Sequence, residues 1–106
     1  MIKTALVLKG ERGILLFRLL RECSEIDLVG IACPDGKTGW LTEVERKKYF
    51  VTTNLDKITA LPEMDTVVDG TGESEVSEYL KENLGSGVRL EQLTSRSVLN
   101  ALINSR

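Results

Sequence analysis

Short apolar runs alternate with helix-type segments along the whole chain, and this alternation constrains the fold more than any other feature of the sequence. The runs are continuously apolar, which is typical of strands whose two faces are both buried in a sheet. Strands that alternate with helices predict parallel pairing through right-handed crossovers, with helices on both faces of one sheet. The expected strands lie at residues 4–10, 26–33, 50–53, 65–72 and 88–93.

Helices are expected between and after these strands. Asn54 is the expected N-cap of one helix, because its side-chain oxygen can accept from a free backbone N–H group in the first turn. Ser74 is the expected N-cap of the next helix, and Gly85 is its stop. A short polar helix is expected at 40–49 and a closing helix at 95–106. The first helix is predicted from apolar residues that recur at helical spacing, namely Leu15, Leu16, Leu19, Leu20 and Cys23.

The predicted fold is a single small Rossmann-like α/β domain that occupies residues 1–106. It is a three-layer sandwich in which a five-stranded parallel sheet, with strand order 3-2-1-4-5, has helices on both faces. A chain of 106 residues can enclose one hydrophobic core but not two. Because of their continuous apolar character, the first, second and fourth runs are expected to be the central strands.

Composition argues against several classes of function. Fourteen Lys and Arg against sixteen Asp and Glu give a net charge of -2, so the electrostatic footprint of a nucleic-acid-binding protein is missing. The apolar runs are too short to span a membrane, and we expect no membrane insertion and no signal peptide. Two cysteines are too few for a disulfide framework and favour a reduced, cytoplasmic setting. The chain has no histidine, which argues against zinc and Ser-His-Asp chemistry.

The stretch VGIACPDGKTGW, residues 29–40, looks like a phosphate-binding P-loop because it ends an apolar run and contains Gly-Lys-Thr. A P-loop has four residues between its first glycine and the Gly-Lys-Ser/Thr motif, whereas five residues separate Gly30 from Gly36. Pro34 also lies in this stretch and has no N–H group to donate to a phosphate. We therefore expect a turn-rich crossover loop and no hydrolysis of nucleoside triphosphates.

A second candidate phosphate site is the first crossover, LVLKGERGILLF. In the dinucleotide fingerprint Gly-x-Gly-x-x-Gly, the second glycine lets the backbone approach a pyrophosphate, and the third allows close packing of helix on strand. Gly10 and Gly13 hold those two places, and Leu8 stands where the first glycine would make the tight turn. Glu11 and Arg12 lie between the glycines and are candidate binding residues with them. The pattern fits two interpretations equally, a binding loop or glycines that serve only the turn and the packing.

The second half of the fingerprint is an acidic residue at the end of the second strand, which holds the ribose of the cofactor. Cys33 stands at that place, with Asp35 two residues later. Cys33 is therefore the candidate for the ribose contact and also a candidate reactive thiol, although a buried inert side chain is the commoner outcome for cysteine. We expect a helix that begins near Arg12 to attract a phosphate, and NAD to bind only weakly.

Four stretches together resemble the small Rossmann-type domain at the front of some bacterial sensor histidine kinases and related PAS-containing signalling proteins. They are ALVLKGERGILLFRLL, IDLVGIAC, MDTVVDGTGESEV and LTSRSVLNAL, which cover nearly the whole chain. That family usually has Gly-Ala-Gly-x-Gly-Gly in the first loop and Val-Ala-Asp after the second strand. The chain is similar, more distantly, to the nucleotide-binding halves of dihydrodipicolinate reductase and semialdehyde dehydrogenases.

The resemblance implies a sensory input domain that binds NAD(P) or another nucleotide weakly and forms the N-terminal module of a longer signalling protein. By this resemblance, Gly10 and Gly13 would face a pyrophosphate. Gly70, Thr71 and Gly72 would line the middle of the cofactor site.

Three classes of function follow from these expectations. The first is a regulatory module that senses a nucleotide or a small metabolite. The second is a dimerisation or interaction domain that has kept the fold and lost the ligand. The third and weakest is the cofactor domain of an NAD(P)-dependent oxidoreductase, with no catalytic activity in this domain alone. The expected partners are a nucleotide or another anion, a second copy of the chain in a two-fold dimer, and downstream signalling domains.

Overall fold

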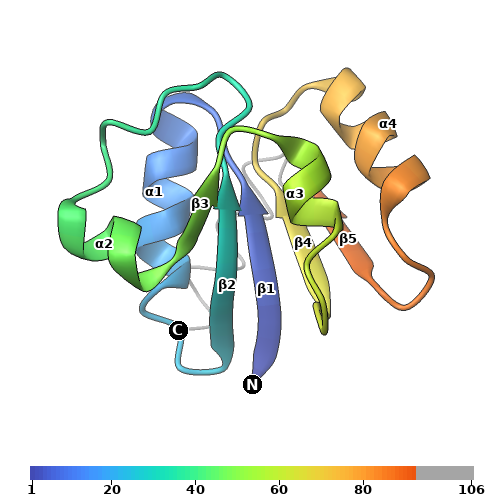
Figure 1. Cartoon of the computed structure of the whole chain (residues 1–106), viewed down its shortest axis with the longest axis horizontal. Helices are drawn as coiled ribbons and strands as arrows, with labels where there is room; N and C mark the ends of the chain where they lie inside the picture. The colour runs from blue at the N-terminus through green and yellow to red at the C-terminus, as the bar shows by residue number, and fades with distance from the viewer. Residues whose placement is uncertain (93–106) are drawn as a thin grey trace.

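The computed structural model describes residues 1–92, apart from the side chain of Arg12, so the closing helix expected at 95–106 lies outside the described residues. The strands are β1 (Ile2–Val7), β2 (Ile26–Ala32), β3 (Phe50–Thr52), β4 (Thr66–Asp69) and β5 (Arg89–Gln92). They form one parallel sheet in the order β3-β2-β1-β4-β5 (Figure 1). The predicted order is confirmed, and β2, β1 and β4 are central.

Helices cover both faces of this sheet, which gives the predicted three-layer sandwich. The helices within the described residues are α1 (Gly10–Leu20), α2 (Glu43–Lys48), α3 (Leu55–Thr59) and α4 (Ser74–Asn83). Figure 1 shows α1 and α2 on one face, and α3 and α4 on the opposite face. None of these four helices has both the length and the apolar character that a membrane crossing requires.

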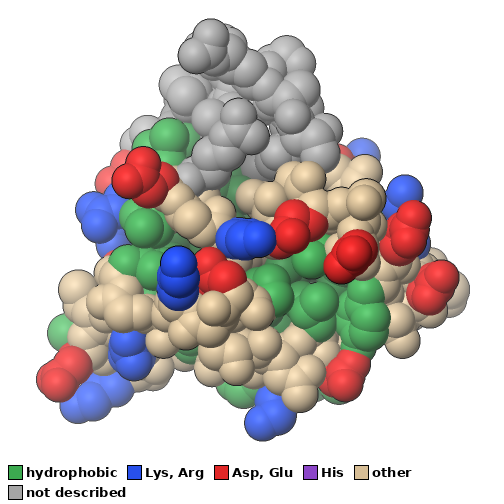
Figure 2. Space-filling view, turned by 90° about the horizontal axis from the view of Figure 1, so that it is seen from above, with side chains coloured by type: hydrophobic (Ala, Val, Ile, Leu, Met, Phe, Trp, Pro, Cys, Tyr) green, Lys and Arg blue, Asp and Glu red, His purple; other side chains and the backbone are tan. Residues whose placement is uncertain are grey.

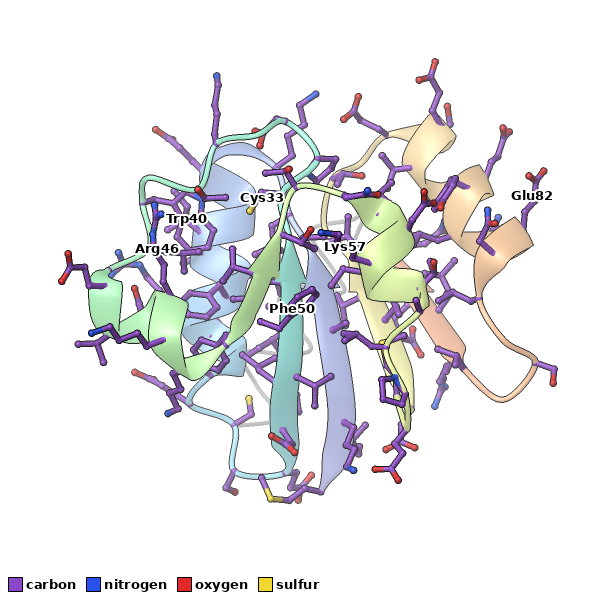
Figure 3. All side chains as sticks on the ribbon, in the orientation of Figure 1. Cys33, Trp40, Arg46, Phe50, Lys57 and Glu82 are labelled. Carbon is purple, nitrogen blue, oxygen red and sulfur yellow. The ribbon has the colours of Figure 1, made fainter. Side chains whose placement is uncertain are left out.

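The α1 face of the sheet is closed by three aromatic rings. Phe17 of α1 is fully buried, and Trp40 and Tyr49 meet its ring edge-on, with centroids 5.4 Å and 5.6 Å away. Such edge-to-face pairs bring the positive edge of one ring to the negative face of another. Trp40, which lies on the loop before α2, thus packs against the core (Figure 3).

The buried side of α1 differs from the predicted one. Gly13, Leu16, Phe17 and Leu20 are buried, and they have the i, i+3, i+4, i+7 spacing of a single helix face. Leu15, one of the apolar residues whose spacing predicts this helix, is 49% exposed. So many positions of α1 are apolar that helical spacing alone is compatible with more than one buried face of the helix.

The opposite face of the sheet has an aliphatic core. Ile58 of α3 and Val76 and Leu80 of α4 are buried in one cluster with Ala5 and Val67 of the central strands. Full burial of a Val, Leu or Ile side chain contributes about 1.5–3 kcal/mol relative to exposure. This cluster therefore holds α4, and with it the loop that precedes α4, against the sheet.

Two of the helices begin at capping side chains. Asn54 caps α3 as predicted, because its Oδ1 accepts from the backbone N–H of Asp56 at 2.9 Å. Thr42 and Glu45 form a capping box at the start of α2, in which each side chain accepts from the other residue's backbone N–H. These caps satisfy N–H groups that the helix itself leaves without partners.

The two longer helices begin without such caps. The N-cap of α4 is Glu73 and not the predicted Ser74, and α1 begins at Gly10, two residues before the predicted start near Arg12. The side chains of Glu73 and of Lys9, the N-cap of α1, make no hydrogen bond to their own helices. Both uncapped ends lie at the carboxyl edge of the sheet.

Two backbone hydrogen bonds at this edge join the residues that follow β1 and β4 to the ends of neighbouring strands. The N–H of Leu8 donates to the carbonyl oxygen of Ala32 at 2.8 Å, which joins the end of β1 to the end of β2. The N–H of Gly70 donates to the carbonyl oxygen of Val7 at 2.8 Å, which joins the end of β4 to β1. The three central strands therefore reach the edge side by side.

Replacing Phe17 by Ala should lower the free energy of unfolding by about 3–5 kcal/mol, because it leaves a cavity in the cluster with Trp40 and Tyr49. Leu15→Ala on the exposed side of the same helix is the matched control and should cost less than about 1 kcal/mol. Urea unfolding, followed by circular dichroism and by the fluorescence of Trp40, measures both. Equal losses would show that the buried side of α1 is assigned wrongly.

Candidate functional site

The candidate site lies where the chain changes direction between β1 and β4. These strands are neighbours in the sheet, but the helices that follow them, α1 and α4, cover opposite faces. In open α/β sheets, ligands bind at such a switch point, outside the carboxyl ends of the strands. Figure 2 views the molecule from this edge, and on the described part basic and acidic side chains are interspersed rather than gathered into one basic patch.

The turn from β1 into α1 leaves backbone donors at this edge. Gly10 has a φ of +69°, a left-handed conformation that glycine adopts without strain. The first N–H groups of any α-helix have no partner inside the helix and carry the positive end of its dipole. Because Lys9 provides no side-chain cap, the first turn of α1 can accept an external anion.

Glu11 and Arg12 belong to this first turn. Glu11 is exposed, and its negative charge next to the helix N-terminus favours the helix while competing with an external anion. The side chain of Arg12 is not among the described ones. Its contribution to binding stays a prediction.

Leu8 occupies the place of the first fingerprint glycine and belongs to the core. It is 1% exposed. A Cβ atom on Gly13 would lie 2.8 Å from the Cβ of Leu8, closer than such atoms approach, so Gly13 allows α1 to pack against the end of β1. Gly70 lies on the other side, where an added Cβ would be 3.4 Å from Cδ2 of Leu8 and 2.9 Å from Cδ2 of Leu16. Gly13 therefore has the packing role of the third fingerprint glycine. The tight turn that the first fingerprint glycine would make is absent, because Leu8 fills its place.

Asp69, at the end of β4, anchors the loop that follows this strand. Its side chain is 1% exposed. Its Oδ1 accepts from the backbone N–H of Thr71 at 2.9 Å and from the Thr71 hydroxyl at 2.7 Å, and its Oδ2 accepts from the Ser77 hydroxyl at 2.8 Å. These donors are the partners of a buried side chain that has no ion pair among the described side chains, and a buried polar group without hydrogen bonds is costly. An aspartate at the end of a strand, two residues before a threonine, is the sequence signal for such a turn.

The bonds of Asp69 continue into the neighbouring elements. The Thr71 hydroxyl oxygen accepts from the backbone N–H of Glu73, the N-cap of α4, at 3.2 Å. Gln92 of β5 donates its side-chain N–H to the Ser77 hydroxyl. One connected network thus holds the loop, the first turns of α4 and the end of β5. Gly72, at a φ of +70°, makes the turn between Thr71 and Glu73.

A salt bridge joins the two loops across the switch point. The Nζ of Lys9 lies 2.8 Å from Oε1 of Glu73, and each side chain is a little under half exposed. The hydrogen bond that Lys9 donates to Glu73, together with the negative charge of Glu73, raises the pKa of Lys9 above its ordinary value, and the charge of Asp35 adds to this rise. Lys9 therefore carries its positive charge at neutral pH. No pattern in the sequence indicates this contact, because 64 residues separate the two partners.

Cys33 lies at the end of β2 with its side chain in the core. It is 1% exposed and belongs to the cluster beneath α1 (Figure 3). Burial raises the pKa of the thiol to about 11, and the charge of Asp35 adds to this rise. At neutral pH the thiol is therefore protonated, which is the unreactive form.

The loop after Cys33 does not have the geometry of a P-loop. The N–H of Gly36 donates to the carbonyl oxygen of Cys33 at 2.9 Å, and the N–H of Lys37 donates to the carboxylate of Asp35 at 3.0 Å. These donors are satisfied inside the loop, whereas a P-loop turns them toward phosphates. The next helix begins only at Glu43.

The structure brings two of the three predicted groups of site residues together. Gly10 to Gly13 and Gly70 to Gly72 lie at the same edge on adjacent strands. Cys33 follows the next strand along this edge, but its side chain is buried. Within residues 1–92, no three His, Cys, Asp or Glu side chains are placed to share a metal ion.

The comparisons with known proteins bear on the fold. No family model matches the chain, and no curated protein matches it. A protein assigned as an oxidoreductase, from Magnetospirillum magnetotacticum MS-1, superposes with a TM-score of 0.63 at 17% identity, over 98% of this chain and 35% of that chain. A protein assigned as a myo-inositol dehydrogenase, from Sinorhizobium meliloti 1021, superposes with a TM-score of 0.61 at 18% identity, over 98% of this chain and 32% of that chain. The chain thus has a Rossmann-like fold and spans about a third of the length of either neighbour.

Cys33 should react with iodoacetamide far more slowly than Cys23 in the folded protein. The thiolate is the attacking form, and at pH 8 a thiol whose pKa is about 11 is ionised to roughly one part in a thousand. Cys23 is half-buried and serves as the internal reference. Mass spectrometry of the labelled peptides, after short exposure in buffer and in urea, measures both rates. Labelling of Cys33 in buffer as fast as in urea would contradict its burial.

Proposed function

We propose that this domain binds an anionic nucleotide at the switch point, with a phosphate group at the first turn of α1. The observation that carries this proposal is the uncapped N-terminus of α1, which begins at a left-handed Gly10 at the carboxyl edge of a central strand. Helix N-termini of this kind bind phosphate through backbone N–H groups and the helix dipole. Lys9 adds a positive charge at the same place.

We propose further that the nucleotide is a cofactor such as NAD(P), and that the domain serves an oxidoreductase. Both structural neighbours described above are assigned as oxidoreductases or dehydrogenases. The sequence offered this role as the weakest of three, and the likeness of fold now supports it over a sensory role. The sensory role in a signalling protein, which rests on the resemblance to histidine kinase domains, gains no support from either neighbour.

Three features argue for weak binding. Leu8 fills the turn that a full dinucleotide needs, and it is part of the core. Cys33 is buried and has no carboxylate with which to accept hydrogen bonds from a ribose. Glu73 places a negative charge near Lys9. We therefore expect a dissociation constant for NAD of about 1 mM, which corresponds to roughly 4 kcal/mol of binding free energy.

Titration with inorganic phosphate, AMP and NAD should shift the backbone amide resonances of Gly10, Glu11, Arg12 and Gly13 in NMR spectra, because their N–H groups would contact the phosphate. Lys9→Ser should weaken this response without unfolding the domain, because serine is a good N-cap and removes the positive charge. Lys57→Ser on α3 is the matched control and should respond like the unaltered protein. A titration with sodium chloride at equal ionic strength is a further control, because it screens the charges of the protein without supplying a phosphate.

An absent response at Gly10 to Gly13 with all three ligands would overturn the proposed function. A response that Lys57→Ser reduces as much as Lys9→Ser would show that the anion is attracted by overall charge and not by the first turn of α1. Submicromolar binding of NAD by the unaltered protein would contradict the effects assigned to Leu8 and Cys33.

A ligand-free interaction domain is the second candidate, and the edge strand β3 favours it. This strand is three residues long, pairs with β2 on one side, and begins at Phe50, which is 41% exposed. An edge strand and an exposed aromatic side chain are features that a second copy of the chain can cover. Figure 3 shows where Phe50 lies on β3.

If the chain forms a two-fold dimer through β3, Phe50→Lys should shift it to the monomer, because charge on an edge strand opposes pairing. Val44→Lys, at an exposed position on α2, is the matched control and should leave the dimer intact. Sedimentation velocity at tens of micromolar measures the mass of each protein. An unaltered protein that sediments as a single 11.8 kDa species would exclude the dimer.

A further inference from the structure

The salt bridge between Lys9 and Glu73 joins the N-caps of α1 and α4. These two helices start from neighbouring strands on either side of the switch point. Neither N-cap side chain bonds the helix that it precedes, and the two side chains bond each other at 2.8 Å instead. The contact therefore lies at the switch point and joins the starts of the two helices.

The position of Glu73 is fixed from inside the protein. Its backbone N–H donates to the Thr71 hydroxyl oxygen, and that hydroxyl donates to the buried carboxylate of Asp69. Asp69 is also bonded to Ser77 of α4. A polar network whose groups are all bonded favours one geometry of the loop. The backbone of Glu73 is thereby held at the edge, within reach of Lys9.

We propose that Glu73 is an internal anion that keeps the phosphate site closed by occupying Lys9 when no ligand is bound. This autoinhibitory contact rests on the proposed function. An incoming phosphate must displace the Glu73 carboxylate from Lys9, and it then takes both the lysine and the first turn of α1. The salt bridge is suited to this role because exposed ion pairs are weak and open without disturbing the fold. Phosphate carries more negative charge than a carboxylate and can use the backbone donors of α1 as well.

The contact also affects which ligands the site admits. A neutral sugar or a nucleoside without phosphate gains nothing from Lys9 that would offset the loss of the salt bridge. A ligand with a terminal phosphate replaces the carboxylate with a stronger acceptor for the same cation. We therefore expect the site to distinguish AMP from adenosine, and Glu73 to set the concentration at which AMP binds.

The test compares Glu73→Gln with Glu78→Gln in the full chain. Both substitutions remove one negative charge from α4 or its N-cap, and Glu78 is exposed and has no ion pair within residues 1–92. Titration with inorganic phosphate and with AMP, followed at the amides of Gly10 to Gly13, gives the dissociation constants. We expect Glu73→Gln to lower both constants by about three- to tenfold, and Glu78→Gln to lower them by less than twofold. The urea midpoint of Glu73→Gln should stay close to that of the unaltered protein.

Each result decides the proposal. If Glu73→Gln, Glu78→Gln and the unaltered protein bind phosphate equally, the closed state is excluded while the proposed function stands. An equal gain in both variants would assign the effect to net charge, and weaker binding by Glu73→Gln would make Glu73 a ligand-binding residue; both results overturn the proposal. If none of the three proteins responds at Gly10 to Gly13, the proposed function fails and the closed state fails with it.

Discussion

The close approach of α1 to the end of β1 is the contact on which the candidate site depends. Gly13 makes it, because any side chain there would collide with Leu8. The same contact buries Leu8 between α1 and the loop after β4, and it brings the start of α1 to the carboxyl edge. One glycine therefore fixes both the packing of the first crossover and the position of the backbone donors that an anion would meet. Packing and binding are not alternatives at this position, although the sequence pattern presented them as two interpretations.

A buried carboxylate organises the other half of the edge. Asp69 would cost several kcal/mol to bury without partners, and it receives three hydrogen bonds from Thr71 and Ser77. These bonds shape the loop after β4, and the Thr71 hydroxyl also accepts from the backbone N–H of Glu73, the N-cap of α4. The site is thus built from a rigid apolar contact on one side and a rigid polar network on the other. The hydrogen bond from Gly70 to Val7 joins the two halves inside the protein. At the surface they are joined by the exposed salt bridge between Lys9 and Glu73, and an exposed ion pair opens easily.

The central strands were predictable because each contains a local signal, an apolar run that ends in a turn. The elements that the sequence misjudged depend on contacts between distant segments. Leu15 has helical spacing with its neighbours, and only the sheet decides which stripe of α1 is buried. The N-cap of α4 is an exception, because the contact there is local. Ser74 is a good N-cap by residue type, but the Thr71 hydroxyl accepts from the N–H of Glu73, and Glu73 is the N-cap. The salt bridge of Glu73 with Lys9 has no local signal at all, because either residue alone is an ordinary surface charge.

The departures from the dinucleotide fingerprint are core features and not simple losses from a binding loop. Glycine in place of Leu8 would remove a fully buried side chain, and truncations of this kind cost about 2–5 kcal/mol. Aspartate in place of Cys33 would put a carboxylate into an apolar cluster, at a further cost of several kcal/mol unless the cluster rearranges. Domains of this size are typically stable by about 5–15 kcal/mol, and a ligand present at a hundred times its dissociation constant adds only about 2.7 kcal/mol. Restoring the fingerprint at both positions would therefore consume most of the stability of the fold. The proposed closed state predicts a less costly route to stronger phosphate binding, the replacement of Glu73, which leaves both core contacts intact.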